Sequence, residues 1–107
     1  MELTINDLKG LLSGQKESTP CETFLEIGKN YQIRTVTMIY TGKLVKESRE
    51  ALVLSEAAWV PETGRFSDSM KDTDLYNEVE PYHRDTVLYK GAFLDVVEID
   101  KLPRGQK

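Results

Sequence analysis

The residues best suited to binding a ligand lie in one short segment, Trp59-Val60-Pro61-Glu62-Thr63-Gly64-Arg65-Phe66. It places an indole, a guanidinium and a second aromatic ring close to a rigid proline and a flexible glycine. Aromatic and arginine side chains form hot spots in protein interfaces and stacking surfaces for bases. Trp59, Arg65 and Phe66 are therefore candidate ligand-binding residues. The alternative is structural, with both rings anchored in the core and Arg65 paired to a nearby carboxylate.

Arg34 and Thr37 form a second candidate group within a stretch rich in β-branched residues. A charge in a strand is costly unless it is paired or faces solvent or a ligand. Arginine beside hydroxyl groups is suited to holding a phosphate. We therefore add Arg34 and Thr37 to the candidate ligand-binding residues. An ion pair between Arg34 and an acidic side chain of the same chain is the alternative.

The sequence favours binding over catalysis. Cys21 and His83 are the only cysteine and histidine, and the spacing indicates no third group to orient them as nucleophile and base. Glu78 and Glu80 share one side of a strand, as two catalytic or cation-binding carboxylates would, but also as solvent-facing residues of an edge strand do. The glycines form no nucleotide-binding fingerprint. We predict no catalytic residue, no metal site and no cofactor.

Charge is distributed unevenly along the 107 residues, whose formal net charge is −4. Residues 62–85 contain seven acidic and three basic side chains and so account for that net charge. An acidic chain is unsuited to gripping extended nucleic acid, because such binding relies on neutralising phosphates. No apolar run approaches the roughly 20 residues that cross a bilayer, and the first residues lack the order of a signal peptide. We expect a cytoplasmic protein with no membrane contact.

The periodicity predicts one mainly β domain behind a short N-terminal helix. Ile5, Leu8, Leu11 and Leu12 recur at helical spacing up to Gly14, so residues 1–22 read as helix and connector and residues 23–107 as the β domain. The β domain is expected to begin with a weak strand over residues 23–27, followed by a long strand over 31–45 that bends near Gly42 and by strands over 51–60 that end at Pro61. A long acidic excursion over 62–85 follows, with a helical turn near 67–71 and a short strand near 78–80. A closing strand over 86–99, interrupted at Lys90-Gly91, completes the domain.

Two segments resemble motifs of the Sm-like family. A bent strand ending in Thr41-Gly42-Lys43-Leu44-Val45, followed by Leu52-Val53-Leu54-Ser55-Glu56-Ala57, looks like its first motif, and residues 87–99 are similar to its closing segment. The resemblance implies a small, strongly bent, five-stranded barrel, although other SH3-like barrels fit the same alternation. It also implies a homo-oligomer formed through the closing strand, which runs from Thr86 to Ile99. The loop Lys46-Glu47-Ser48-Arg49-Glu50 lacks the Asp and Asn of the RNA-binding members, so uridine binding is not implied.

A second resemblance is to small uncharacterised phage and prophage proteins. It rests on Ile33-Arg34-Thr35-Val36-Thr37-Met38, Ala57-Ala58-Trp59-Val60 and Thr63-Gly64-Arg65-Phe66. It implies an accessory protein that sequesters a molecule or blocks a host machine. The predicted function is a non-enzymatic, oligomeric module that binds a nucleotide-like or anionic ligand. The alternative is a protein–protein inhibitor or adaptor that acts through the acidic residues 62–85.

Overall fold

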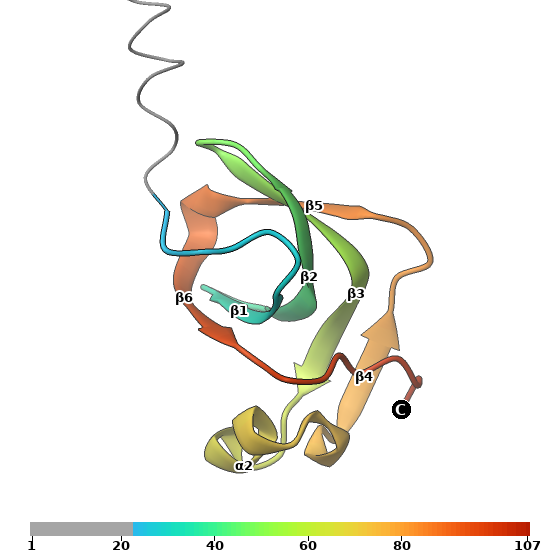
Figure 1. Ribbon diagram of the computed structural model, residues 1–107. Helices are drawn as coiled ribbons and strands as arrows, with labels where there is room; N and C mark the ends of the chain where they lie inside the picture. Colours follow the sequence, from blue (N-terminus) through green and yellow to red (C-terminus); the bar gives the residue numbers. More distant parts are fainter. Residues whose placement is uncertain (1–22) are drawn as a thin grey trace, which may run out of the picture.

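The computed structural model describes residues 23–107, so the predicted N-terminal helix and connector lie outside the described residues. Six antiparallel strands form one strongly curled sheet (Figure 1). The strands are β1 (Asn30–Thr35), β2 (Ile39–Glu47), β3 (Ala51–Glu62), β4 (Glu78–Pro81), β5 (Thr86–Tyr89) and β6 (Phe93–Glu98). The short helix α2 (Phe66–Lys71) and the 3-10 turns η1 (Thr73–Leu75) and η2 (Lys90–Ala92) complete the described elements.

The long strand β3 organises the sheet. Strands β1, β2 and β3 form a meander, β6 pairs with the free edge of β1, and β3 pairs with β5 along its first half and β4 along its second. Strands β5 and β6 are joined by η2 but do not pair with each other, so the ladder is not closed into a barrel. The mainly β prediction is confirmed, while the sheet has six strands where five were predicted.

Local signals placed some elements correctly and others wrongly. The helical turn, the short strand at Glu78 and the break at Lys90 are all confirmed. The predicted long strand over residues 31–45 is wrong, because a tight turn separates β1 from β2 and is held by hydrogen bonds between Thr35 and Met38. Residues 23–29 form no strand. Pro61 does not end β3, because it lies in an irregular part of the ladder where no paired N–H is required.

A β-bulge in β3 exchanges the two faces of the strand. Lys43 pairs with Ser55 and Thr41 with Ala58, so the single residue Gly42 lies opposite two residues of β3. One of these, Glu56, has a φ of 50°, the left-handed conformation that one position of such bulges requires. The bend predicted near Gly42 is therefore present, but as an irregularity between two strands.

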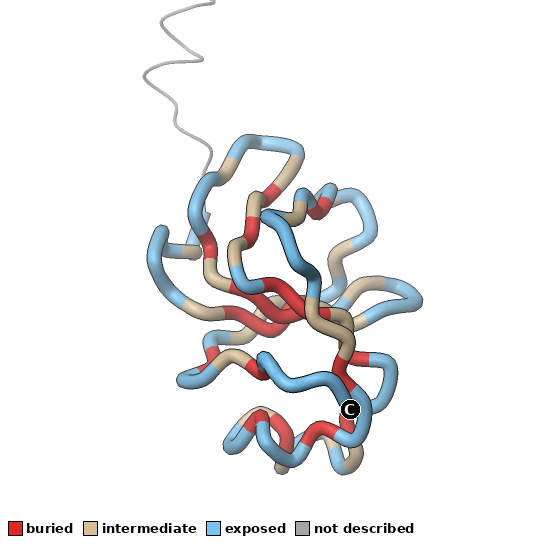
Figure 2. The backbone as a smooth tube through the Cα atoms, turned by 90° about the vertical axis from the view of Figure 1, so that its right-hand side faces the viewer, coloured by how far each residue is buried: buried red, intermediate tan, exposed pale blue. Residues whose placement is uncertain are grey.

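Because the bulge exchanges the two faces of the strand, β3 contributes side chains to two separate cores. The first core lies inside the curl and contains Tyr31, Ile33, Leu44, Leu52, Leu54, Ala57 and Leu88. The second lies against the outer face and contains Ala58, Val60, Tyr76 and Val79. Neighbouring alanines 57 and 58 are both buried because they point into different cores. Figure 2 shows the resulting band of buried residues along the strands, with further buried positions in the segment below it.

The acidic excursion folds onto the sheet through the second core. The buried Tyr76 hydroxyl donates a hydrogen bond of 2.5 Å to Oε1 of Gln32 on β1. This burial raises the pKa of the Tyr76 phenol well above its ordinary value. The C-terminal segment adds further links, since the Thr73 hydroxyl donates to the Lys101 carbonyl and the Lys107 amide to the Val79 carbonyl. The excursion is thus a packed layer.

Replacing Gly42 with alanine tests the bulge. An added Cβ would lie 2.7 Å from Cβ of Leu54, which is backbone-fixed and cannot move aside. We expect Gly42→Ala to lower the free energy of unfolding by roughly 1–3 kcal/mol, measured by urea denaturation. Gly91→Ala is the matched control, because nothing lies within 4 Å of its added Cβ and it should be nearly neutral. Equal stability of the two variants would contradict the close packing at Gly42.

Candidate functional site

The structure brings together two of the predicted ligand-binding residues, Arg34 and Phe66. The Arg34 guanidinium lies 5.7 Å from the centre of the Phe66 ring, which is cation–π distance. The same guanidinium forms an ion pair with Asp95 on β6, and its Nε donates a hydrogen bond of 3.0 Å to Oδ2. This hydrogen bond, followed by the Asp95 charge, raises the pKa of Arg34. The intramolecular alternative for Arg34 is therefore realised.

Arg65 and Thr37, the other two polar candidates, do not take part in the Arg34–Phe66 contact. The Arg65 side chain is 79% exposed, and its Nε lies 3.8 Å from the carboxylate of Asp68 one helical turn later. Thr37 lies exposed in the turn between β1 and β2, where its side chain forms no hydrogen bond within the described part of the chain. Arg34 and Arg65 thus each face a carboxylate of this protein.

Trp59 lies on the opposite face of the sheet from Arg34. Directly paired residues of antiparallel strands point to the same face. Trp59 pairs with Tyr40, which pairs with Ile33 of the first core, whereas Arg34 pairs with Ile39, which packs against the second core. The predicted ligand-binding set is therefore divided between two faces, because Trp59 and Arg34 fall in opposite phases of the sheet.

Trp59 instead belongs to an aromatic row that crosses three strands. Tyr40 of β2, Trp59 of β3 and Glu80 of β4 are consecutive cross-strand partners. Tyr82 continues from β4, and its amide donates a hydrogen bond of 2.8 Å to the Ala57 carbonyl, which places it opposite Ala57 on the same face. We call Tyr40, Trp59, Glu80 and Tyr82 the aromatic row. The sequence pointed to Trp59 and raised Glu80 as a possible cation-binding carboxylate, but it did not mark Tyr40 or Tyr82, because their proximity follows from strand register.

The aromatic row is partly open to solvent. Tyr82 is 38% exposed, and Tyr40, Trp59 and Glu80 are partly buried. Burial, with a smaller effect from the neighbouring Tyr40, raises the pKa of the Tyr82 phenol. Tyr82 thus lies at the accessible end of the row.

Arg104 braces the end of the aromatic row. Its guanidinium donates hydrogen bonds to the carbonyls of Ala57 and Tyr82, at 2.9 and 3.3 Å. Arginine can hold two carbonyls at once because its donors form a fixed planar fork. The contact ties the C-terminal segment to the point where β4 ends. No sequence signal marked Arg104 for this position.

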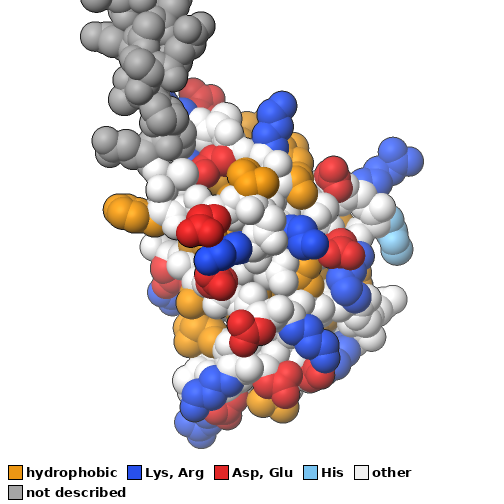
Figure 3. Space-filling view, in the orientation of Figure 1, with side chains coloured by type: hydrophobic (Ala, Val, Ile, Leu, Met, Phe, Trp, Pro, Cys, Tyr) orange, Lys and Arg blue, Asp and Glu red, His pale blue; other side chains and the backbone are white. Residues whose placement is uncertain are grey.

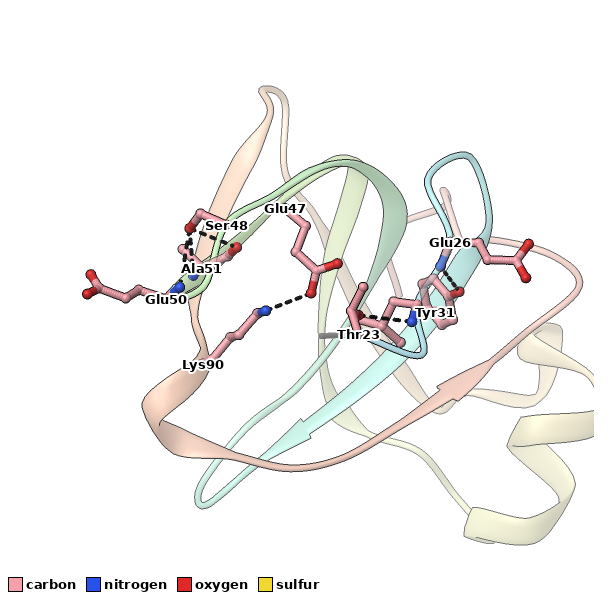
Figure 4. Close-up of polar contacts among 9 residues, drawn as sticks. Thr23, Glu26, Tyr31, Glu47, Ser48, Glu50, Ala51 and Lys90 are labelled. Carbon is pink, nitrogen blue, oxygen red and sulfur yellow. Dashed lines mark hydrogen bonds and ion pairs between the residues drawn. The ribbon is translucent and has the colours of Figure 1, made fainter. Parts of the chain in front are cut away.

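A separate polar cluster surrounds the turn between β2 and β3 (Figure 4). Nζ of Lys90 lies 2.6 Å from the carboxylate of Glu47, whose side chain is only 8% exposed. The Lys90 amide also donates to the Glu50 carbonyl, and the Ser48 hydroxyl accepts from the amides of Glu50 and Ala51. Lys90 is thus engaged in joining η2 to the β2–β3 hairpin.

Groups suited to metal binding do not converge. No three His, Cys, Asp or Glu side chains of residues 23–107 lie together in a way that could hold a metal ion. His83 is exposed, and Cys21 lies outside the described residues. Glu78 pairs directly with Glu62 across the β3–β4 ladder, so two carboxylates of like charge face each other. Such a pair destabilises a sheet unless a cation compensates it.

The charged surface shows no single-sign face in the view of Figure 3, where acidic and basic side chains are interspersed among apolar ones. Several exposed apolar residues lie on β5 and β6, including Val87, Tyr89 and Leu94. Within the described residues there is no helix of the length and apolar character needed to span a membrane.

Comparisons with protein-family models, with curated proteins and with solved structures find no match to this chain. The arguments for function therefore rest on the geometry of the described residues.

The ion pair between Asp74 and Lys101 gives a testable pH dependence. A hydrogen bond from Lys101, at 2.7 Å, is the main cause that lowers the pKa of Asp74. Because the folded pKa is depressed, this stabilisation is present above the unfolded pKa and is lost as the pH falls through the folded value. We expect Lys101→Gln to raise the Asp74 pKa in an NMR titration. Lys71→Gln removes the same charge elsewhere and should leave it unchanged.

Proposed function

We propose that this protein is a non-enzymatic binding module that docks onto a partner protein through the aromatic row. The observation that carries the proposal is the alignment of Tyr40, Trp59 and Tyr82 on one accessible face, beside a carboxylate with no ion pair in the described residues. Aromatic side chains offer a large contact area with few rotatable bonds, which is why they dominate interface energies.

The divided charges favour a partner protein over the predicted nucleotide-like or anionic ligand. Arg34 and Arg65 each lie against a carboxylate, so an anion would have to compete with Asp95 and Asp68. Trp59, the predicted stacking residue, lies on the other face of the sheet. Glu80 of the aromatic row belongs to the acidic residues 62–85, which supports the adaptor or inhibitor function.

We further propose that the curled sheet is an SH3-like or Sm-like barrel in type. The support is that β5 lies along β3 and β6 along β1 while only η2 separates β5 from β6, so the two ends of the meander are brought close together. The second edges of β5 and β6 are unpaired within the described residues, and Val87, Tyr89 and Leu94 are exposed near them. Self-association through residues 86–99 would cover these edges.

Substitution of Trp59 tests the docking surface. Native mass spectrometry of the full chain, purified from its own cells, is expected to show a bound protein. Trp59→Ala is expected to lower the bound fraction at least tenfold, because it removes the central ring of the row. Tyr89→Ala is the matched control, since Tyr89 is 73% exposed on β5 and lies outside the row.

The two variants distinguish the surfaces clearly. Loss of the partner in Tyr89→Ala but not in Trp59→Ala would show that docking uses the β5 edge and would overturn the proposal. Urea denaturation of both variants confirms that they remain folded at the temperature of the measurement.

A further inference from the structure

We infer that the aromatic row recognises a positively charged side chain, and specifically an arginine presented by the partner protein. The inference rests on the proposed function and names the chemistry of the partner. It depends on three features of the row: an unpaired carboxylate, aromatic rings on the same face, and an excess of acidic groups on the adjoining strands.

Glu80 is the first feature. It lies directly opposite Trp59 in the β3–β4 ladder, a pairing that places the two Cβ atoms about 5 Å apart. Its carboxylate has neither an ion pair nor a hydrogen bond to any of residues 23–107, although the side chain is partly buried. A carboxylate that is partly withdrawn from water attracts a cation more strongly than a fully exposed one.

The aromatic rings are the second feature. Tyr40 and Trp59 are cross-strand neighbours, and the Tyr82 amide bonds the Ala57 carbonyl two residues before Trp59 on β3. A guanidinium is attracted to the face of an indole or phenol ring, and it can stack on that ring while its edge donates two hydrogen bonds to a carboxylate. Arginine therefore satisfies the rings and Glu80 together, whereas an ammonium group provides only a point charge.

The surrounding charges are the third feature. Glu62 and Glu78 face each other across the same β3–β4 ladder that carries Trp59 and Glu80, and neither has an ion pair in the described chain. A basic partner would relieve this repulsion as it docks. Two basic residues lie near the row, and both are directed at main-chain carbonyls: Arg104 at those of Ala57 and Tyr82, and Lys107 at those of Asp74 and Tyr76. A phosphate or nucleotide bound at the rings would be repelled by the neighbouring Glu80 carboxylate.

The test uses the full chain and a defined probe, the capped peptide Gly-Arg-Gly-Arg-Gly. Trp59 is the only tryptophan in the chain, so its fluorescence reports on the row alone. We expect saturable quenching by the arginine peptide and at least tenfold weaker binding of the same peptide with citrulline, a neutral side chain of similar shape.

Two charge-matched variants localise the effect. Glu80→Gln is expected to weaken binding of the arginine peptide about tenfold, because it removes the carboxylate that the guanidinium contacts. Glu50→Gln removes the same charge in the β2–β3 turn, outside the row, and should change the affinity less than twofold. Retention of the wild-type thermal unfolding midpoint shows that each variant is folded.

Several outcomes would overturn the inference. These are equal binding of the arginine and citrulline peptides, equal effects of the Glu80 and Glu50 substitutions, or quenching of Trp59 by adenosine monophosphate but not by the arginine peptide. If the peptide fails while Trp59→Ala still releases the natural partner, the arginine inference is wrong and the proposed function stands. If Trp59→Ala retains that partner, the proposed function itself fails.

Discussion

The structure depends on one irregularity above the others, the bulge at which Gly42 of β2 lies opposite Glu56 and Ala57 of β3. A regular strand presents alternate residues to one face, so a shift of one position moves every later side chain to the other side. Here that shift allows β3 to place Leu54 and Ala57 in the first core and Ala58 in the second. Gly42 is required because the Leu54 side chain occupies the space that any Cβ would need.

The second core turns the acidic excursion into a structural layer. Tyr76 fills it and reaches across to Gln32 on β1, while the Arg34–Phe66 contact ties α2 to the same strand. These contacts link residues far apart in the chain, and the first gives the buried Tyr76 hydroxyl a hydrogen-bond partner on the sheet. A buried hydroxyl is tolerable only when it is hydrogen-bonded, so the packing of Tyr76 depends on its partner in the sheet.

The sequence predicted those elements that are determined by residues close to one another in the chain. The helical turn before Lys71, the strand at Glu78 and the break at Lys90 follow from nearby turn residues and alternation. The turn at Val36-Thr37-Met38 could not be predicted in this way, because it contains no glycine or proline and is held by the Thr35 hydroxyl. Likewise, nothing marks Glu56 for a positive φ. Trp59 was predicted as a ligand-binding residue, but its companions Tyr40 and Tyr82 depend on strand register, which one sequence does not reveal.

The surroundings of Trp59 bear on the proposed docking surface. Its neighbours Ala58 and Val60 are both buried in the second core, so the backbone that carries the indole is fixed from behind. Arg104 holds the other end of the row by bonding the carbonyls of Ala57 and Tyr82. A surface whose rings are held in place before docking loses little conformational entropy on binding, so its affinity for a partner is higher. Two cores around one strand therefore support both the sheet and its partly exposed aromatic face.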